Sequence, residues 1–143
     1  MITMTEKYKI LGKYIKDMSS ETPDIETFIF VKDYISRYQL NIDINSKALK
    51  DKMIEVNTIM KFEDKEKNKK KSYFEINYAT IIKISDEIKE KKDLEKIILC
   101  DLQTEIYPDL EKALLDLLHN SGYNEIKFEK KVDFEQLYNQ RLN

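Results

Sequence analysis

Three carboxylates stand on segments whose periodicity could bring them onto one surface. Asp17 and Glu21 have the same parity in the expected strand from Tyr14 to Thr22, so their side chains point to one side of it. Glu75 lies in a second expected strand, and antiparallel pairing would set it on that same side. Carboxylates gathered in this way repel one another until a cation docks. An ordinary solvated sheet face would show the same pattern, and these residues alone leave both interpretations open.

A second candidate is the run from Ile25 to Ile35, which is unusually apolar for a segment that connects two strands. Its aromatic side chains are Phe28, Phe30 and Tyr34. Aromatic groups supply a large apolar contact area and lose little rotamer entropy on contact, which suits a surface that binds other polypeptides. The run could instead be a lid over the chain's own core, and the residues do not decide between the two.

Catalytic chemistry is not indicated. The chain has a single histidine, His119, and a single cysteine, Cys100, and neither stands in an HxxE, CxxC or GxSxG motif. With only two glycines in the chain, glycine-rich phosphate loops are absent as well. We therefore predict that the protein is not an enzyme and that it uses neither a cofactor nor a bound metal.

Composition narrows the class of partner. The chain has 143 residues, of which 36% are charged and 41% hydrophobic, with a net charge of only -2. This length predicts one domain over residues 1–143, with a loosely ordered lead over residues 1–13. The balanced charge argues against nucleic-acid binding, and the lack of a long apolar run argues against membrane insertion. A lone cysteine and no signal-like start favour the cytoplasm.

The stretch from Ser72 to Ile84 organises the predicted fold, because it alternates apolar and polar side chains at period two. Phe74, Ile76 and Tyr78 share its apolar side. Further strands are predicted at Tyr14–Thr22, Tyr38–Ile44 and Met53–Phe62, followed by helices at Asp86–Cys100, at Thr104–Asn120 and from Asp133 onward. Strands followed by helices predict an α+β fold with a four-stranded antiparallel sheet.

Several short pieces of sequence occur in an order that is familiar from one protein family. They are YIKDMSSETP at 14–23, LNIDIN at 40–45, EV at 55–56, FEINYATIIKI at 74–84, IYP at 106–108, SGY at 121–123 and VDFEQLYNQRL at 132–142. As a set, colinear over most of the chain, they resemble the protein-export chaperone family SecB.

The resemblance implies an antiparallel sheet with helices behind it, assembled as a dimer of dimers, that is, a homotetramer. It implies an ATP-independent holdase that binds unfolded preproteins and hands them to SecA, the translocation motor, whose zinc-bearing C-terminal tail would be the contact. An alternative is a SecB-like chaperone that serves another client, such as the antitoxin of a toxin-antitoxin pair.

The resemblance also implies roles for individual residues. The client groove would be lined by Phe28, Phe30, Tyr34, Leu40 and Ile42. SecA would bind Asp17, Glu21 and Glu75, with Tyr73 as a neighbouring apolar contact. Phe74, Ile76 and Tyr78 would lie inward, at the seam between protomers.

Overall fold

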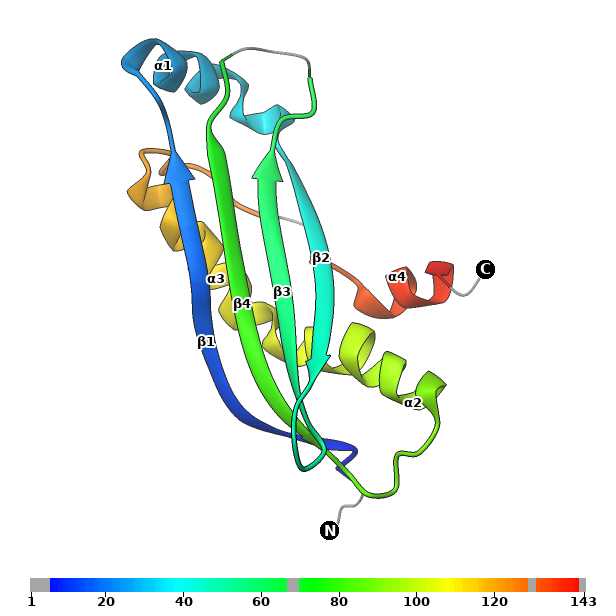
Figure 1. The fold of residues 1–143 in the computed structure, drawn as a ribbon. Helices are drawn as coiled ribbons and strands as arrows, with labels where there is room; N and C mark the ends of the chain where they lie inside the picture. Colours follow the sequence, from blue (N-terminus) through cyan, green and yellow to red (C-terminus); the bar gives the residue numbers. More distant parts are fainter. Residues whose placement is uncertain (1–5, 67–69, 129–130, 142–143) are drawn as a thin grey trace.

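The computed structural model describes residues 6–66, 70–128 and 131–141, and Figure 1 shows its elements. The strands are β1 (Tyr8–Glu21), β2 (Gln39–Ala48), β3 (Met53–Glu63) and β4 (Tyr73–Ile84). The helices are α1 (Ile25–Tyr34), the 3-10 helix η1 (Ile35–Arg37), α2 (Lys91–Lys96), the π-helical segment η2 (Ile97–Asp101), α3 (Leu102–Asn120) and α4 (Phe134–Arg141). The strands form one antiparallel sheet in the order β1-β4-β3-β2, which confirms the predicted α+β fold.

The apolar side of β4 forms the centre of the protomer's own core. Phe74, Ile76 and Tyr78 are 2%, 0% and 7% exposed, and the side of the sheet to which they point is the one that α3 crosses. This burial corrects the expectation that these three residues lie at a seam between protomers. The chain's own residues already cover them, including α3 and, over Phe74, the rings of Tyr38, Phe62 and Tyr123.

The helix α3 covers the sheet because its apolar residues recur at helical spacing. Ile106, Leu110, Leu114 and Leu118 are each 0% or 1% exposed, and they form a single stripe along the helix. The two predicted helices before residue 120 are continuous in the structure, since α2, η2 and α3 follow one another without a gap. A π-helical turn shifts the phase of the apolar pattern, so the sequence reads as two helices.

A buried glutamine fixes the π-helical segment onto the sheet. Gln103 is 0% exposed, and its side-chain amide donates to the carbonyl of Ile98 at 3.1 Å. The hydroxyl of Thr58, on the covered side of β3, donates to the Gln103 side-chain oxygen at 3.0 Å. Because buried polar groups are costly without partners, these bonds set the position of η2 along β3.

The first strand is longer than the sequence indicates. It begins at Tyr8, within the predicted loose lead, of which residues 1–5 lie outside the described residues. Register shifts on either side of Leu11 and Lys16 break its period-two pattern, which hides the early half of the strand. Tyr8 donates a hydrogen bond to Glu105 of α3, so this early half is joined to the helix layer.

Among the described residues, α3 crosses behind the sheet, α1 lies at its upper end, and no helix covers the front of the sheet in Figure 1. In the described part of the chain, no helix has both the length and the hydropathy that crossing a bilayer requires.

An aromatic cavity and an acidic sheet face

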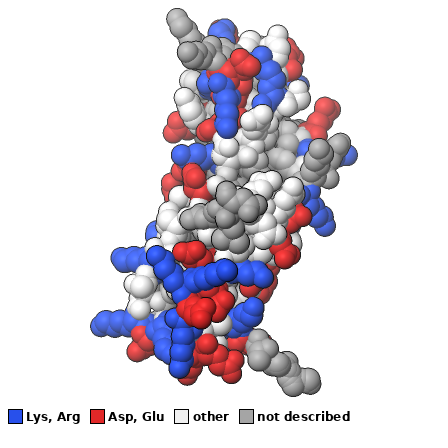
Figure 2. All heavy atoms as spheres, turned by 90° about the vertical axis from the view of Figure 1, so that its right-hand side faces the viewer, with Lys and Arg blue, Asp and Glu red and all other residues white. Residues whose placement is uncertain are grey.

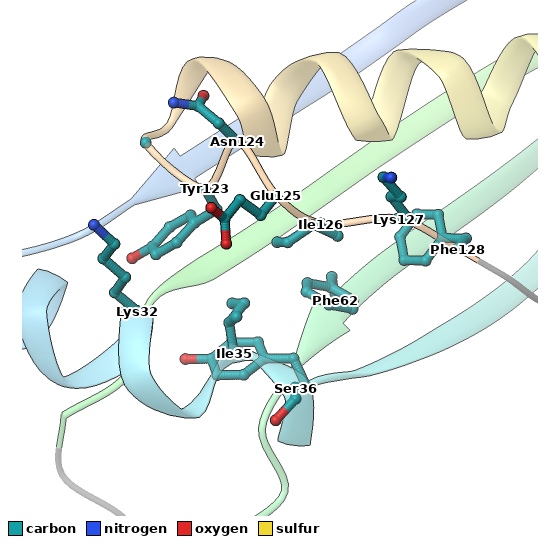
Figure 3. A pocket seen from close by; sticks show the side chains of 12 residues that line it. Lys32, Ile35, Ser36, Phe62, Tyr123, Asn124, Glu125, Ile126, Lys127 and Phe128 are labelled. Carbon is teal, nitrogen blue, oxygen red and sulfur yellow. The ribbon is translucent and has the colours of Figure 1, made fainter.

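A cavity of about 490 Å³ opens where α1 and η1 meet the segment that follows α3 (Figure 3). Its lining residues are Lys32, Ile35, Ser36, Tyr38, Phe62, Gly122, Tyr123, Asn124, Glu125, Ile126, Lys127 and Phe128. The inner walls are apolar and aromatic, whereas Lys32, Glu125 and Lys127 are exposed at the rim. Such a cavity takes apolar side chains and leaves charged groups near water.

The aromatic walls are held by contacts between rings from three parts of the chain. The centroid of the Phe62 ring lies 5.5 Å from that of Tyr38 and 5.7 Å from that of Phe128. Tyr123 meets Phe74 edge to face at 5.6 Å, which connects the cavity to the core under β4. Ring pairs at these distances add stability beyond their buried area and limit rotation. The walls are therefore preformed.

A buried serine joins the two tyrosines of the cavity. The backbone N–H of Ser72 donates to the Tyr38 hydroxyl at 3.1 Å, and the Ser72 and Tyr123 hydroxyls are 3.2 Å apart. Ser72 is 1% exposed, and burial raises the pKa of the Tyr38 hydroxyl. Both phenols thus use their polar ends in the protein's own hydrogen bonds and present ring faces to the cavity.

A capping residue and two packing contacts fix the position of α1 beside the cavity. Asp24 caps the helix by accepting a hydrogen bond from the backbone N–H of Thr27 at 2.8 Å. Val31 is 1% exposed, and the Phe28 ring lies 5.3 Å from that of Tyr123. The predicted apolar run therefore forms a helix whose inner side covers part of the core, while Ile29 on its outer side is 56% exposed.

The cavity is lined by residues other than those predicted for the client groove, which were Phe28, Phe30, Tyr34, Leu40 and Ile42. Phe28 lies behind the cavity wall, against Tyr123 and Gly122. Phe30 and Tyr34 pack on each other at 4.6 Å, and Leu40 and Ile42 pack against the core from β2. The residues missed include Ile126 and Phe128. Both are apolar residues in a stretch that is neither helix nor strand. That was the signal in the sequence, because large apolar side chains outside regular elements usually pack into the core or line a cavity.

Gly122 allows the close approach of the segment after α3 to α1. Its φ is 106°, a backbone conformation that favours glycine, and an added Cβ would lie 2.6 Å from an edge atom of the Phe28 ring. We expect Gly122→Ala to lower stability by about 1–3 kcal/mol, through backbone strain and this overlap. Thermal unfolding measures the effect. Gly12→Ala is the matched control, because nothing lies within 4 Å of its added Cβ, and equal losses in both variants would contradict this role.

The acidic residues predicted on β1 and β4 share the open side of the sheet. In the register of β1 with β4, Glu21 pairs with Tyr73, Ser19 with Glu75, and Asp17 with Asn77. Directly paired residues point to the same side, so Asp17, Glu21, Glu75 and Tyr73 lie together on the side opposite the buried Ile76. Tyr73 is 57% exposed. We call these four residues the acidic face.

A lysine already neutralises part of the acidic face. Lys61 of β3 pairs with Glu75 in the register, and its Nζ lies 3.7 Å from a Glu75 carboxylate oxygen. The set is therefore less repulsive than three isolated carboxylates, which corrects the sequence-based expectation. Among the described residues, no group of three or more His, Cys, Asp and Glu side chains is arranged to hold a metal ion.

Comparison with known proteins bears on what these two sites do. A family model described as "Preprotein translocase subunit SecB" matches residues 3–143. The chain belongs to the SecB family. Among SecB relatives, the putative protein-export protein SecB of Pelagibacter ubique is 61% identical over 140 residues, which cover 98% of this chain and 100% of the relative. The protein-export protein SecB of Parvibaculum lavamentivorans is 25% identical, over 93% of this chain and 77% of the relative.

The SecB fold is also found among solved structures. The Mycobacterium tuberculosis SecB-like chaperone Rv1957, in complex with a ChAD peptide from the HigA1 antitoxin Rv1956, aligns with a TM-score of 0.62. The alignment covers 87% of this chain and 91% of that one at 11% sequence identity, so it supports the fold alone. The aromatic cavity and the acidic face thus lie on a protomer that belongs to the SecB family.

Proposed function

We propose that the chain is an ATP-independent export chaperone that holds unfolded preproteins in the aromatic cavity and delivers them to SecA. The observation that carries the proposal is the cavity itself, which is about 490 Å³ in volume, walled by aromatic rings and open to solvent. Membership of the SecB family and the export function in the names of its relatives support the same role.

The cavity suits clients of many sequences. Each apolar client side chain buried there contributes about 1.5–3 kcal/mol before ordering costs, whichever aliphatic or aromatic residue it is. Several cavities on one assembly then hold a single unfolded chain through avidity. Preference for unfolded over folded proteins follows, because only unfolded chains expose several apolar side chains at once.

Aggregation of an unfolded test protein measures this function. We expect the chaperone to keep a reduced, unfolded client in solution at near one assembly per client, with no nucleotide present. Light scattering over time is the measurement, and a folded form of the same client is the control. Scattering that is unchanged by the chaperone, or reduced only after ATP is added, would contradict the proposal.

We propose further that the acidic face binds the basic, zinc-bearing tail of SecA. Asp17 and Glu21 are exposed and Glu75 is half-buried, on a side of the sheet that no described helix covers, and the exposed Tyr73 offers an apolar contact beside them. Attraction between exposed charges decays over about 10 Å at 0.1 M ionic strength, so the complex should form fast and weaken with salt.

Reversing two charges tests this assignment. The variant Asp17→Lys with Glu21→Lys should abolish binding of the isolated SecA tail at low salt, while suppression of client aggregation stays intact. Isothermal titration calorimetry is the measurement. Lys61→Ala is the opposite control, because it releases Glu75 from its ion pair and should strengthen tail binding. Undiminished binding by the double variant would refute the assignment. Failure of the unmodified chain to bind the tail would favour another client, such as an antitoxin.

Assembly is proposed through the outer edge of β1. This strand lies at the end of the sheet order, and its Leu11, Ile15 and Met18 are 47%, 45% and 48% exposed. A sheet edge that carries exposed apolar groups is a template for pairing with another chain. We propose that two copies pair there and that two such dimers form the homotetramer. Sedimentation equilibrium should give the mass of four chains, and a monomer mass would contradict this.

A further inference from the structure

A second cavity, of about 420 Å³, lies at the end of the sheet far from the aromatic cavity. It is formed by the turn between β2 and β3, the end of β4 and the start of α2. Its apolar walls include Leu49, Met53 and Leu94, above Ile54 and Ile84, which are 9% and 8% exposed. Nothing in the proposed client or SecA contacts uses this cavity, which we call the basal cavity.

The walls of the basal cavity are fixed by backbone hydrogen bonds. The N–H of Met53 donates to the carbonyl of Lys50 at 3.1 Å, and that of Ile84 donates to the carbonyl of Lys52 at 3.0 Å. Asp51 and Lys52 both have positive φ, 59° and 62°, which defines a type I′ turn without glycine. The N–H of Ile88 donates to the carbonyl of Ser85 at 3.1 Å. The cavity is therefore ordered before any ligand arrives.

The rim of the basal cavity is positively charged. Lys52, Lys89 and Lys91 line it together with one acid, Glu90. Figure 2 shows Lys and Arg side chains over the lower end of the molecule, with Asp and Glu side chains among them. Lys52 donates a hydrogen bond to Asp86, but within the described part of the chain neither Lys89 nor Lys91 forms an ion pair.

The lysines act together on this end of the molecule. The hydrogen bond from Lys52 lowers the pKa of Asp86, and the positive charges of Lys52, Lys83 and Lys89 lower it further. The residues that line the basal cavity thus carry more positive than negative charge, whereas the acidic face is negative. A basic partner that suits the acidic face would be repelled by Lys89 and Lys91, so the charge of the rim favours an acidic partner for the basal cavity.

We propose that the basal cavity docks an acidic segment of a partner protein, with an apolar side chain inserted between the β2–β3 turn and α2. Carboxylates on either side of that apolar residue would pair with Lys89 and Lys91. Charge complementarity selects this occupant, because a basic segment of the kind proposed for the acidic face would be repelled by the rim. This inference does not rest on the proposed chaperone function.

A labelled peptide tests the proposal directly. The probe is a short fluorescein-labelled peptide in which glutamates flank a central Leu-Phe pair, and its partner probe carries lysines in place of the glutamates. We expect saturable binding of the acidic probe by the full chain, measured by fluorescence anisotropy at low salt, and no saturable binding of the basic probe. Equal binding of both probes, or no binding of the acidic one, would overturn the proposal.

Matched variants locate the site. Lys89→Glu with Lys91→Glu should weaken binding of the acidic probe by about tenfold or more, because two attractions become repulsions. Lys65→Glu with Lys112→Glu changes the net charge equally at exposed positions elsewhere and should leave binding unchanged. Equal losses in both pairs would indicate a general charge effect and overturn the assignment.

Further measurements distinguish an acidic protein segment from other possible occupants of the basal cavity. Ala48→Trp, which places a large side chain at the cavity wall, should reduce binding without altering the thermal melting temperature by more than a few degrees. An unfolded client that occupies the aromatic cavity should not displace the probe, and full competition would overturn the proposal. Lysine-dependent binding to anionic phosphatidylglycerol vesicles, with no binding of the acidic probe, would assign the cavity to a lipid surface instead.

Discussion

Replacing Ile76 by aspartate should unfold most of the protomer. Ile76 is 0% exposed and lies in β4 between Met18 of β1 and Met60 of β3. A carboxylate there would be buried without a partner, at a cost of several kcal/mol, whereas a domain of this size is stable by only about 5–15 kcal/mol. Circular dichroism during heating is the measurement, and we expect a loss of structure or a strongly lowered melting temperature.

The same substitution at an exposed isoleucine is the control. Ile29→Asp places the charge on the outer side of α1, where the side chain is 56% exposed, and should leave the melting temperature nearly unchanged. An Ile76→Asp protein with normal melting but a smaller assembly would mean that this side of β4 contacts a second copy, as the family resemblance implies. The burial of Ile76 by its own chain predicts the opposite.

Removing two apolar groups from the aromatic cavity should weaken client binding by about a hundredfold. Ile126 and Phe128 both line the cavity and are partly exposed, so a bound client can cover them. Replacing each with serine removes roughly 1.5 kcal/mol or more of apolar contact, and about 1.4 kcal/mol corresponds to a factor of ten. The measurement is the Kd for a fluorescent, permanently unfolded client.

A second pair of serine substitutions tests whether the client binds in the cavity or on the surface of α1. The rings of Phe30 and Tyr34 pack on each other in a tilted pair but do not line the cavity, so Phe30→Ser with Tyr34→Ser should change the Kd by much less. If this pair weakened binding more than Ile126→Ser with Phe128→Ser, the client site would lie on the surface of α1, where the sequence placed it. Circular dichroism of both double variants checks that the fold is retained.

Local patterns were enough to predict the sheet and its two sides. The alternation from Ser72 to Ile84 separates the buried Ile76 from the outward Glu75, and the register with β1 then sets Glu75 beside Asp17 and Glu21. Parity along a strand is a local property, which a sequence carries directly. The placement of the acidic face followed from it, while the pairing of Glu75 with Lys61 required the register between β3 and β4.

The aromatic cavity could not be predicted in the same way, because it forms where distant segments meet. Tyr38 lies just before β2, Phe62 near the end of β3 and Tyr123 in the segment after α3. Their contact depends on how far α3 runs along the sheet and where it ends. Gly122 ends it at a positive φ and turns the chain toward α1. The aromatic residues of α1 led to the prediction of a client groove there, but tertiary packing determines which rings line the cavity.

Methyl NMR during titration with an unfolded preprotein tests the central claim most directly. Isoleucine δ1 methyl groups report on every relevant surface, with Ile35 and Ile126 in the aromatic cavity, Ile29 on the outer side of α1 and Ile88 in the basal cavity. We predict that client binding shifts the signals of Ile35 and Ile126 and leaves that of Ile88 in place. Shifts at Ile29 or Ile88, with Ile35 and Ile126 unchanged, would contradict the assignment of the aromatic cavity as the client site.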